Sequence, residues 1–130
     1  MTQKRELQFR EPSEHESQAA VVAWAKENES KWPELKLLYA IPNGYNKSMA
    51  SAIKAKKEGL RAGIPDLCLP VARGPFIGLY IEMKKKKGVI SPAQQGLIEL
   101  LKQNKHQVYV ARSAIDAIAV IKTYMWMSPR

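Results

Sequence analysis

Two short apolar runs separated by a turn-rich connection constrain the fold of this 130-residue chain more than any other feature. The first run covers residues 63–71 and the second covers residues 78–84, with glycine and proline between them. Runs of this length bounded by turn residues are typical of β-strands, and so short a connection joins neighbouring strands. The pattern therefore predicts a β-hairpin near the middle of the chain.

Two acidic residues and a lysine lie at the strand ends of the predicted hairpin. Asp66 enters the first strand, and Glu82 lies near the end of the second. Because the side chains of a strand alternate between its faces, Tyr80, Glu82 and Lys84 share one face while the residues between them pack. Two carboxylates and an ammonium group around one point suit a divalent cation bound through oxygen, with the lysine beside an attacking water or a phosphate.

The residues around these charges resemble a known nuclease motif. Pro65-Asp66 followed by Glu82-Met83-Lys84 is similar to the pattern of the PD-(D/E)XK nuclease superfamily. The surrounding residues resemble its VRR-NUC (virus-type replication-repair nuclease) branch over roughly residues 14–124. The supporting motifs, in chain order, are Ile41-Pro42-Asn43-Gly44, Glu58-Gly59, Gly63-Ile64, Gly88 and Ser91-Pro92-Ala93-Gln94.

The resemblance implies a restriction-endonuclease-like α/β fold, Mg²⁺ or Mn²⁺ as cofactor, and DNA as substrate. On the matching positions, Asp66 and Glu82 would bind the metal ion, and the backbone carbonyl of Met83 would add an oxygen ligand. Lys84 would position or deprotonate the nucleophile and stabilise the transition state. The match also favours Gln94 as the residue that orients a water or a phosphate oxygen; a surface glutamine is the alternative.

The family also carries an acidic residue on its first helix, which is predicted here over residues 14–28 with Ser13 as N-cap. Glu14 and Gln18 fall on the helical face that packs on the core, whereas Glu16 projects elsewhere. A carboxylate on that face needs a partner, so Glu14 is expected to bind the metal directly or through water, with Glu16 as the alternative. A favourable interaction with the helix dipole would explain Glu14 without a metal.

The other elements follow from hydrophobic periodicity and turn signals. They are a strand over 36–41, a helix over 47–58, a helix from Pro92 to about Asn104, a strand over 107–111 and a helix capped by Ser113. The order αβαββαβα suits one mixed sheet flanked by helices. We expect a single domain over residues 13–125, preceded by a mobile N-terminal arm (1–12) and followed by a C-terminal tail (126–130).

The net charge of +9 is unevenly distributed, because residues 35–87 hold eleven basic and three acidic side chains. A basic belt around a carboxylate pair favours a polyanionic substrate. The candidate DNA contacts are Asn43, Lys47, Lys54, Lys57, Lys85, Lys86 and Lys87. A solvated helix face and a solvated strand end are the alternatives for the lysines, and a tight turn is the alternative for Asn43.

Other kinds of site have little support in the sequence. Cys68 is the only cysteine and lies inside an apolar run, so we expect a buried side chain and no intramolecular disulfide. His15 and His106 lack partners at metal-ligand spacing. No apolar segment is long enough to span a bilayer, and the N-terminus lacks a signal-peptide core. We therefore expect no membrane partner and a cytoplasmic protein, of prokaryotic or viral origin.

The sequence thus predicts a metal-dependent DNA endonuclease that acts on branched or structured DNA and resembles a Holliday-junction resolvase. Two alternatives are a sequence-specific restriction-type nuclease and a non-catalytic basic module that binds nucleic acid. Because symmetrical cleavage of a four-way junction needs two active sites, we also expect a homodimer. Its interface would involve the apolar C-terminal region around Tyr124 and Trp126 or the basic helix near Lys54.

Overall fold

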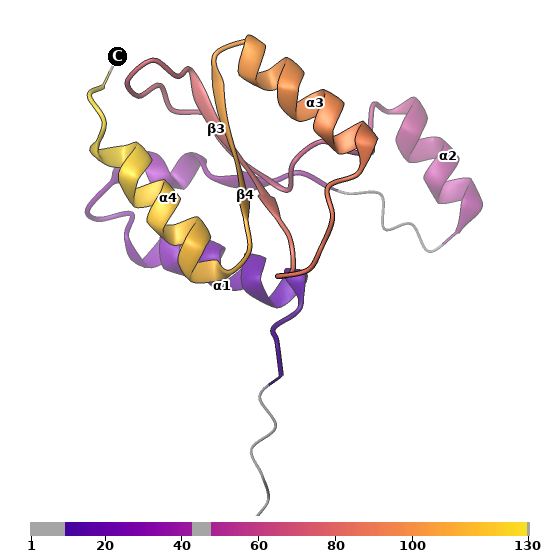
Figure 1. The fold of residues 1–130 in the computed structure, drawn as a ribbon, viewed down its shortest axis with the longest axis horizontal. Coiled ribbons are helices and arrows are strands. Elements are labelled where there is room, and N and C mark those ends of the chain that lie inside the picture. The colour runs from indigo at the N-terminus through magenta and orange to yellow at the C-terminus, as the bar shows by residue number, and fades with distance from the viewer. Residues whose placement is uncertain (1–9, 43–47, 130) are drawn as a thin grey trace, which may run out of the picture.

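A computed structural model describes residues 10–42 and 48–129 and shows a four-stranded mixed sheet flanked by helices (Figure 1). This arrangement confirms the predicted fold class and element order, to which the structure adds a short 3₁₀ helix, η1. The elements in chain order are α1 (Glu14–Glu27), η1 (Pro33–Leu37), β1 (Tyr39–Ala40), α2 (Met49–Lys57), β2 (Leu67–Leu69), β3 (Gly78–Met83), α3 (Pro92–Gln103), β4 (His106–Ala111) and α4 (Ala114–Trp126).

The strands lie in the order β1-β2-β3-β4. The pairs β1–β2 and β2–β3 are antiparallel, which confirms the predicted hairpin, and β3–β4 is parallel. A parallel pair needs a long crossover between its strands, and α3 supplies it here. The backbone N–H of Ile41 donates to the carbonyl of Asp66 at 2.8 Å, so the sheet continues to the residue that begins the predicted motif.

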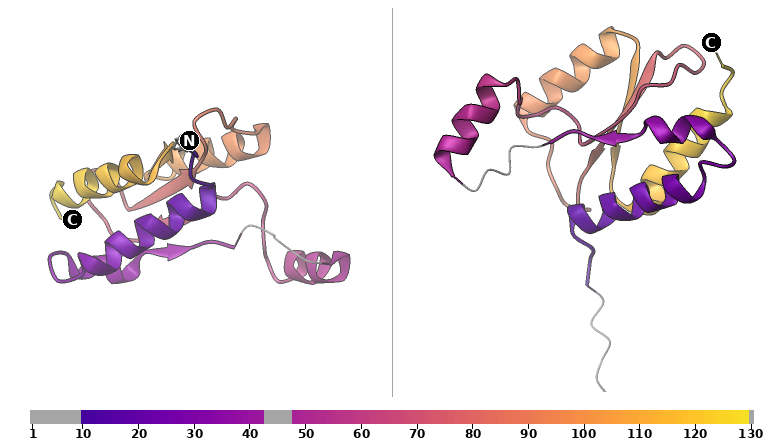
Figure 2. Two further views of the ribbon diagram at one scale, coloured as in Figure 1. Left: turned by 90° about the horizontal axis from the view of Figure 1, so that it is seen from below. Right: turned by 180° about the vertical axis from the view of Figure 1, so that it is seen from behind.

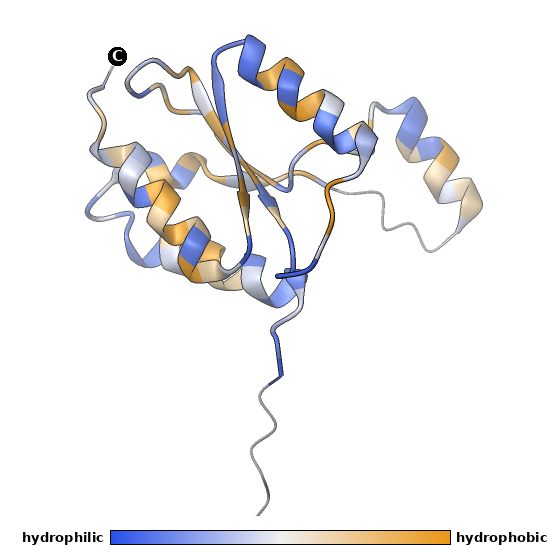
Figure 3. Ribbon diagram, in the orientation of Figure 1, coloured by the Kyte–Doolittle hydropathy of each residue, from blue (hydrophilic) through white to orange (hydrophobic). Residues whose placement is uncertain are grey.

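One face of the sheet forms the core with α1 and α4. Leu67 and Leu69 of β2 and Leu79, Ile81 and Met83 of β3 all belong to this buried cluster. Figure 2 shows α1 and α4 side by side, and Figure 3 shows apolar residues along the strands and α4. The opposite face, packed on its β4 side by α3, therefore carries the alternate residues of the hairpin, as the period-2 pattern predicts.

Serine side chains fix where the helices begin. Ser13, Ser91 and Ser113 accept hydrogen bonds from the third residue of α1, α3 and α4, which confirms the three predicted N-caps. In α1 and α3 the cap is a full capping box, completed by Glu16 and Gln94. Each such cap stabilises a helix by about 1 kcal/mol, so the first turns of α1 and α3 are held in place.

Two predicted strands differ from the structure. The strand predicted over residues 36–41 is wrong in its first half, because Pro33–Leu37 form η1 and only Tyr39–Ala40 pair as β1. Proline in the first turn suits a helix, and this turn buries Leu35 to 2% exposure. The first hairpin strand is shorter than predicted, since the chain before β2 turns at Gly63, whose φ is +88°.

The prediction that Tyr124 belongs to a dimer surface is wrong. Its side chain is fully buried in the core, and its hydroxyl donates to the carbonyl of Val71. Trp126, at the end of α4, is 70% exposed. The chain then returns to the hairpin turn, where the N–H of Gly74 donates to the carbonyl of Ser128 at 2.8 Å.

Two of the expected DNA contacts, Asn43 and Lys47, lie outside the described residues, as does most of the predicted N-terminal arm. Within the described ranges, none of the helices is both long and apolar enough to cross a membrane.

Candidate active site

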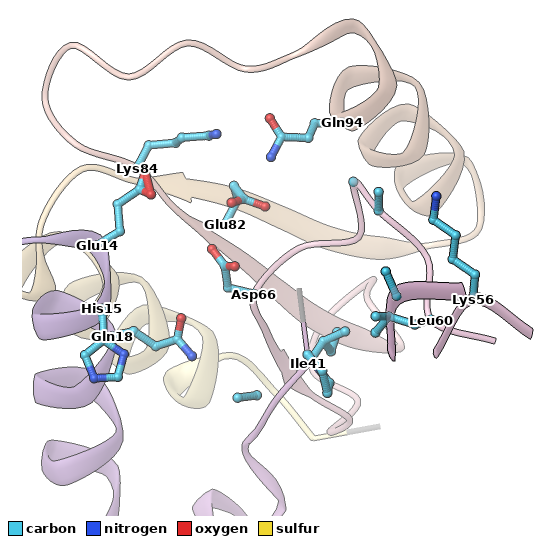
Figure 4. A pocket seen from close by; sticks show the side chains of 15 residues that line it. Glu14, His15, Gln18, Ile41, Lys56, Leu60, Asp66, Glu82, Lys84 and Gln94 are labelled. Carbon is cyan, nitrogen blue, oxygen red and sulfur yellow. The ribbon is translucent and has the colours of Figure 1, made fainter. Parts of the chain in front are cut away.

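The hairpin register brings the two predicted carboxylates together. Leu67 pairs with Ile81, so the next pair along the antiparallel strands places Asp66 beside Glu82 (Figure 4). One carboxylate oxygen of Asp66 accepts a hydrogen bond from the N–H of Met83 at 2.8 Å. This bond crosses from the start of β2 to the end of β3 and fixes the Asp66 side chain against its neighbour.

Glu82 is a buried acid. It is only 3% exposed, and its Oε2 atom has no hydrogen-bond partner among the described residues. Burial, a hydrogen bond with Asp66 and the negative charge of Asp66 together raise the pKa of Glu82 to about 8, and the Lys84 ammonium opposes the rise. A buried carboxylate oxygen that lacks a partner beside a second carboxylate is an arrangement that a cation would relieve.

Glu14 and Glu16 leave the first turn of α1 in different directions. Glu14 is half-buried and lines the cavity above the carboxylate pair, where its negative charge adds to the raised pKa of Glu82 (Figure 4). Glu16 instead completes the capping box and pairs with Arg10 at 3.0 Å, and these contacts lower the pKa of Glu16 to about 2. The geometry therefore favours Glu14 over Glu16 as the helix-borne acid of the site.

Gln94 has two roles in the structure. The side-chain Oε1 atom of Gln94 accepts from the backbone N–H of Ser91 at 2.9 Å, and the backbone N–H of Gln94 donates to the Ser91 hydroxyl. Because the cap uses the amide oxygen, the amide NH₂ group is left as a donor. The side chain extends toward the cavity beside Lys84 and Glu82 (Figure 4).

One cavity of about 940 Å³ collects these residues from several elements. It contains all five side chains predicted to be catalytic, which are Glu14, Asp66, Glu82, Lys84 and Gln94. It is also lined by His15 and Lys56, which the prediction did not include among its site residues. Lys56 lies four residues after Ala52, another lining residue, so the two share a helical face; the sequence alone did not show that this face meets the cavity.

Lys84 differs from the lysines that follow it. Lys84 is half-buried and lines the cavity, whereas Lys85, Lys86 and Lys87 are exposed and do not. Side chains from elsewhere in the chain hold the backbone of this turn: the N–H of Lys86 donates to the Glu11 carboxylate at 2.9 Å, and the Arg112 guanidinium donates to the carbonyl of Lys85 at 3.0 Å. Lys54 and Lys57 are likewise exposed on α2, outside the cavity lining.

The donor set fits a cation that keeps part of its water shell. Within residues 10–42 and 48–129, no group of three or more acidic, histidine or cysteine side chains is close enough to hold a metal ion by itself. The site instead offers the pair Asp66 and Glu82, with one carboxylate oxygen lacking a partner. Mg²⁺ is usually bound by one or two carboxylates, with waters and substrate phosphates as the other ligands. The pair therefore supplies the number of carboxylates that such an ion usually takes.

Comparisons with known proteins agree with this geometry. The family model of the VRR-NUC domain matches residues 2–115. A solved structure, that of a "VRR_NUC domain protein", is similar with a TM-score of 0.80 and 32% sequence identity, over 93% of this chain and 94% of that chain. No curated protein matches the sequence. The site residues thus lie in a fold that is shared nearly end to end with a solved structure.

Proposed function

The chain belongs to the VRR-NUC domain family of PD-(D/E)XK-type nucleases, and on this premise we propose that it is a metal-dependent endonuclease that hydrolyses phosphodiester bonds in DNA. Nucleases of this type generally use divalent metals. The observation that carries the proposal is the buried Glu82 beside Asp66, with Lys84 in the same cavity.

Each residue of the cavity has a role that follows from its chemistry. Asp66 and Glu82 would hold Mg²⁺ or Mn²⁺, the carbonyl of Met83 would add an oxygen ligand, and Glu14 would contribute directly or through water. The ion, when bound, lowers the pKa of a water and offsets negative charge on the phosphate. An ordinary carboxylate has already lost its proton at neutral pH, so its metal affinity would change little with pH in this range. Glu82 has a raised pKa and must lose its proton before it can act as a ligand.

Lys84 and Gln94 would act on the reacting groups. The Lys84 ammonium would orient the attacking water and stabilise the charge that builds on the phosphate oxygens. The Gln94 NH₂ group would donate to a water or phosphate oxygen beside it. The water forms one phosphorus–oxygen bond as another breaks, so no covalent intermediate with the protein is needed.

We further propose a preference for branched DNA, cut by a homodimer. The exposed lysines of α2 and of the turn after β3 would contact backbone phosphates, which carry no sequence information, so shape rather than base sequence would select the substrate. Two cuts related by symmetry require two active sites. Trp126, which is exposed and packs against Trp32 with ring centroids 5.8 Å apart, is a candidate for the dimer surface.

A cleavage assay with linear duplex, flap and four-way junction side by side, in Mg²⁺ or Mn²⁺, tests this function. We expect metal-dependent cleavage that is fastest on the branched substrates. Discrete cuts in plain duplex would favour the restriction-type alternative. DNA binding with no metal-dependent cleavage of any substrate would favour the non-catalytic module and contradict the proposal.

A further inference from the structure

Helix α2 stands apart from the rest of the protein (Figures 1 and 2). None of its nine residues is buried, and no other described helix or strand packs extensively against it. It nevertheless presents large apolar side chains, since Met49 is 81% exposed and Ile53 is 51% exposed. A helix this short is marginal without packing, so these exposed side chains point to a partner outside the chain's own core.

The exposed apolar residues extend the wall of the catalytic cavity. Met49, Ala52, Ile53 and Lys56 are spaced three and four residues apart, so they share one face of α2, which we call the α2 stripe. Ala52 and Lys56 line the cavity that holds the carboxylate pair. Met49 and Ile53 therefore continue the same surface outward, along the direction in which α2 leaves the body of the protein.

Charge indicates what kind of partner fits the α2 stripe. Lys54, Lys56 and Lys57 all lie in the last turn of α2, and the first turn has no acidic residue. A second copy of the chain that met this surface about a two-fold axis would place these lysines against one another. A polyanion meets no such repulsion, so the basic surface next to the cavity favours nucleic acid.

Apolar side chains beside phosphate-binding lysines suit a particular form of DNA. In a regular duplex the apolar faces of the bases are stacked and cannot be reached by a side chain. Proteins that do reach them insert apolar residues between base steps and unstack them, at a cost in free energy. That cost is least where a base is already unpaired. The α2 stripe would therefore discriminate between branched and continuous DNA.

We propose that the α2 stripe contacts an unstacked base next to the cleaved phosphate, with Met49 and Ile53 as an apolar wedge and Lys56 bound to a neighbouring phosphate. The substrate class that follows is DNA with unpaired or unstacked nucleotides beside the cut. This inference rests on the proposed nuclease function and assigns the choice of substrate to α2 rather than to the metal site.

The test uses 2-aminopurine, a fluorescent base that brightens when it unstacks, placed beside the branch point of a flap substrate. The Asp66→Asn protein serves as the background, so that binding is measured without cleavage. We expect fluorescence to rise on binding and the rise to be lost in Met49→Gln/Ile53→Gln. The control Ile115→Gln, at a site that is 81% exposed on α4, should keep it. With Asp66 restored, the double variant should cleave the flap about tenfold more slowly at saturating protein, a loss of about 1.4 kcal/mol.

Several results would overturn the inference. An unchanged fluorescence rise in the double variant would show that Met49 and Ile53 do not reach the bases. A change from dimer to monomer mass in light scattering would assign the stripe to contact between copies of the chain. Met49→Ala/Ile53→Ala removes the same apolar side chains but keeps α2 helical, because alanine favours the helix. It should also lose the fluorescence rise, and a rise kept in this variant would overturn the inference. Because the fluorescence is measured without cleavage, a chain that cuts no DNA would contradict the proposed function alone.

Discussion

The surface around the carboxylate pair has a packed half and an exposed half, and the contrast separates chemistry from substrate binding. The packed half consists of α1, β2 and β3, where core residues such as Val21 and Ile81 have at most 1% exposure. It carries Asp66, Glu82 and Glu14. The exposed half consists of α2 and the lysines at 85–87, with no buried residue in α2. Groups that must be held near one point lie on packed elements, whereas groups that must adapt to DNA do not.

The largest effects should come from the carboxylate pair. Asp66→Asn or Glu82→Gln should reduce cleavage by at least about a hundredfold, because each removes a charge that holds the metal. DNA binding should tighten in Asp66→Asn, since a negative charge that repels the phosphate is lost, and should stay the same in Glu82→Gln, whose carboxyl holds its proton at neutral pH. Single-turnover cleavage and a binding titration on the same junction measure the two effects. Full metal-dependent activity in either variant would contradict the assignment of the site.

Lys84 and Lys86 lie on opposite sides of the boundary between the two halves. Lys84→Ala should lose nearly as much activity as the carboxylate variants, because its ammonium stabilises charge in the transition state. Lys86→Ala should mainly weaken binding and reduce the salt dependence of binding by about one ion. Cleavage rates at saturating protein, together with binding at several salt concentrations, distinguish them. Equal behaviour of the two variants would make Lys84 just one member of a basic run.

The first turn of α1 offers a narrower test. Glu14→Gln should lower activity more than Glu16→Gln, because only Glu14 lines the cavity. Glu16→Gln should instead lower the melting temperature, through loss of the Arg10 pair and weakening of the capping box. Activity compared at equal folded fraction separates the two roles. The reverse ranking of activity would move the helix-borne acid to Glu16, and two small effects would remove α1 from the site.

The smallest expected effects concern stability, and they test the contrast directly. Val21→Ala, in the buried face of α1, should destabilise the fold by about 2 kcal/mol, because two buried methyl groups are lost and a cavity is left. Ile53→Ala, on α2, should change stability by less than about 0.5 kcal/mol. Urea unfolding of both variants gives the comparison. A large loss in Ile53→Ala in the absence of DNA would show that α2 is packed in solution.

Much of this arrangement could be predicted from the sequence, because local signals were strong where they mattered. Alternation in the hairpin predicted which face Glu82 shares with Lys84, and Ser91 followed by Pro92 marked the start of a helix. The Pro33–Leu37 turn was missed because a short apolar run fits a strand or a helical turn equally well. α4 is apolar on most sides, so periodicity could not tell buried Tyr124 from exposed Ile115.

The central claim is that Asp66 and Glu82 form a metal site, and calorimetric titration of the DNA-free protein with Mn²⁺ tests it most directly. The pKa of Glu82 is raised from 4.5 to about 8, so this carboxyl holds its proton at neutral pH and must release it to bind a cation. We predict that wild-type affinity rises as pH increases from about 6 to about 8, with fewer protons released at the higher pH. Asp66→Asn and Glu82→Gln should lose the binding, and Lys86→Ala should keep it. Equal Mn²⁺ binding by wild type and both carboxylate variants, with no proton release, would contradict the claim.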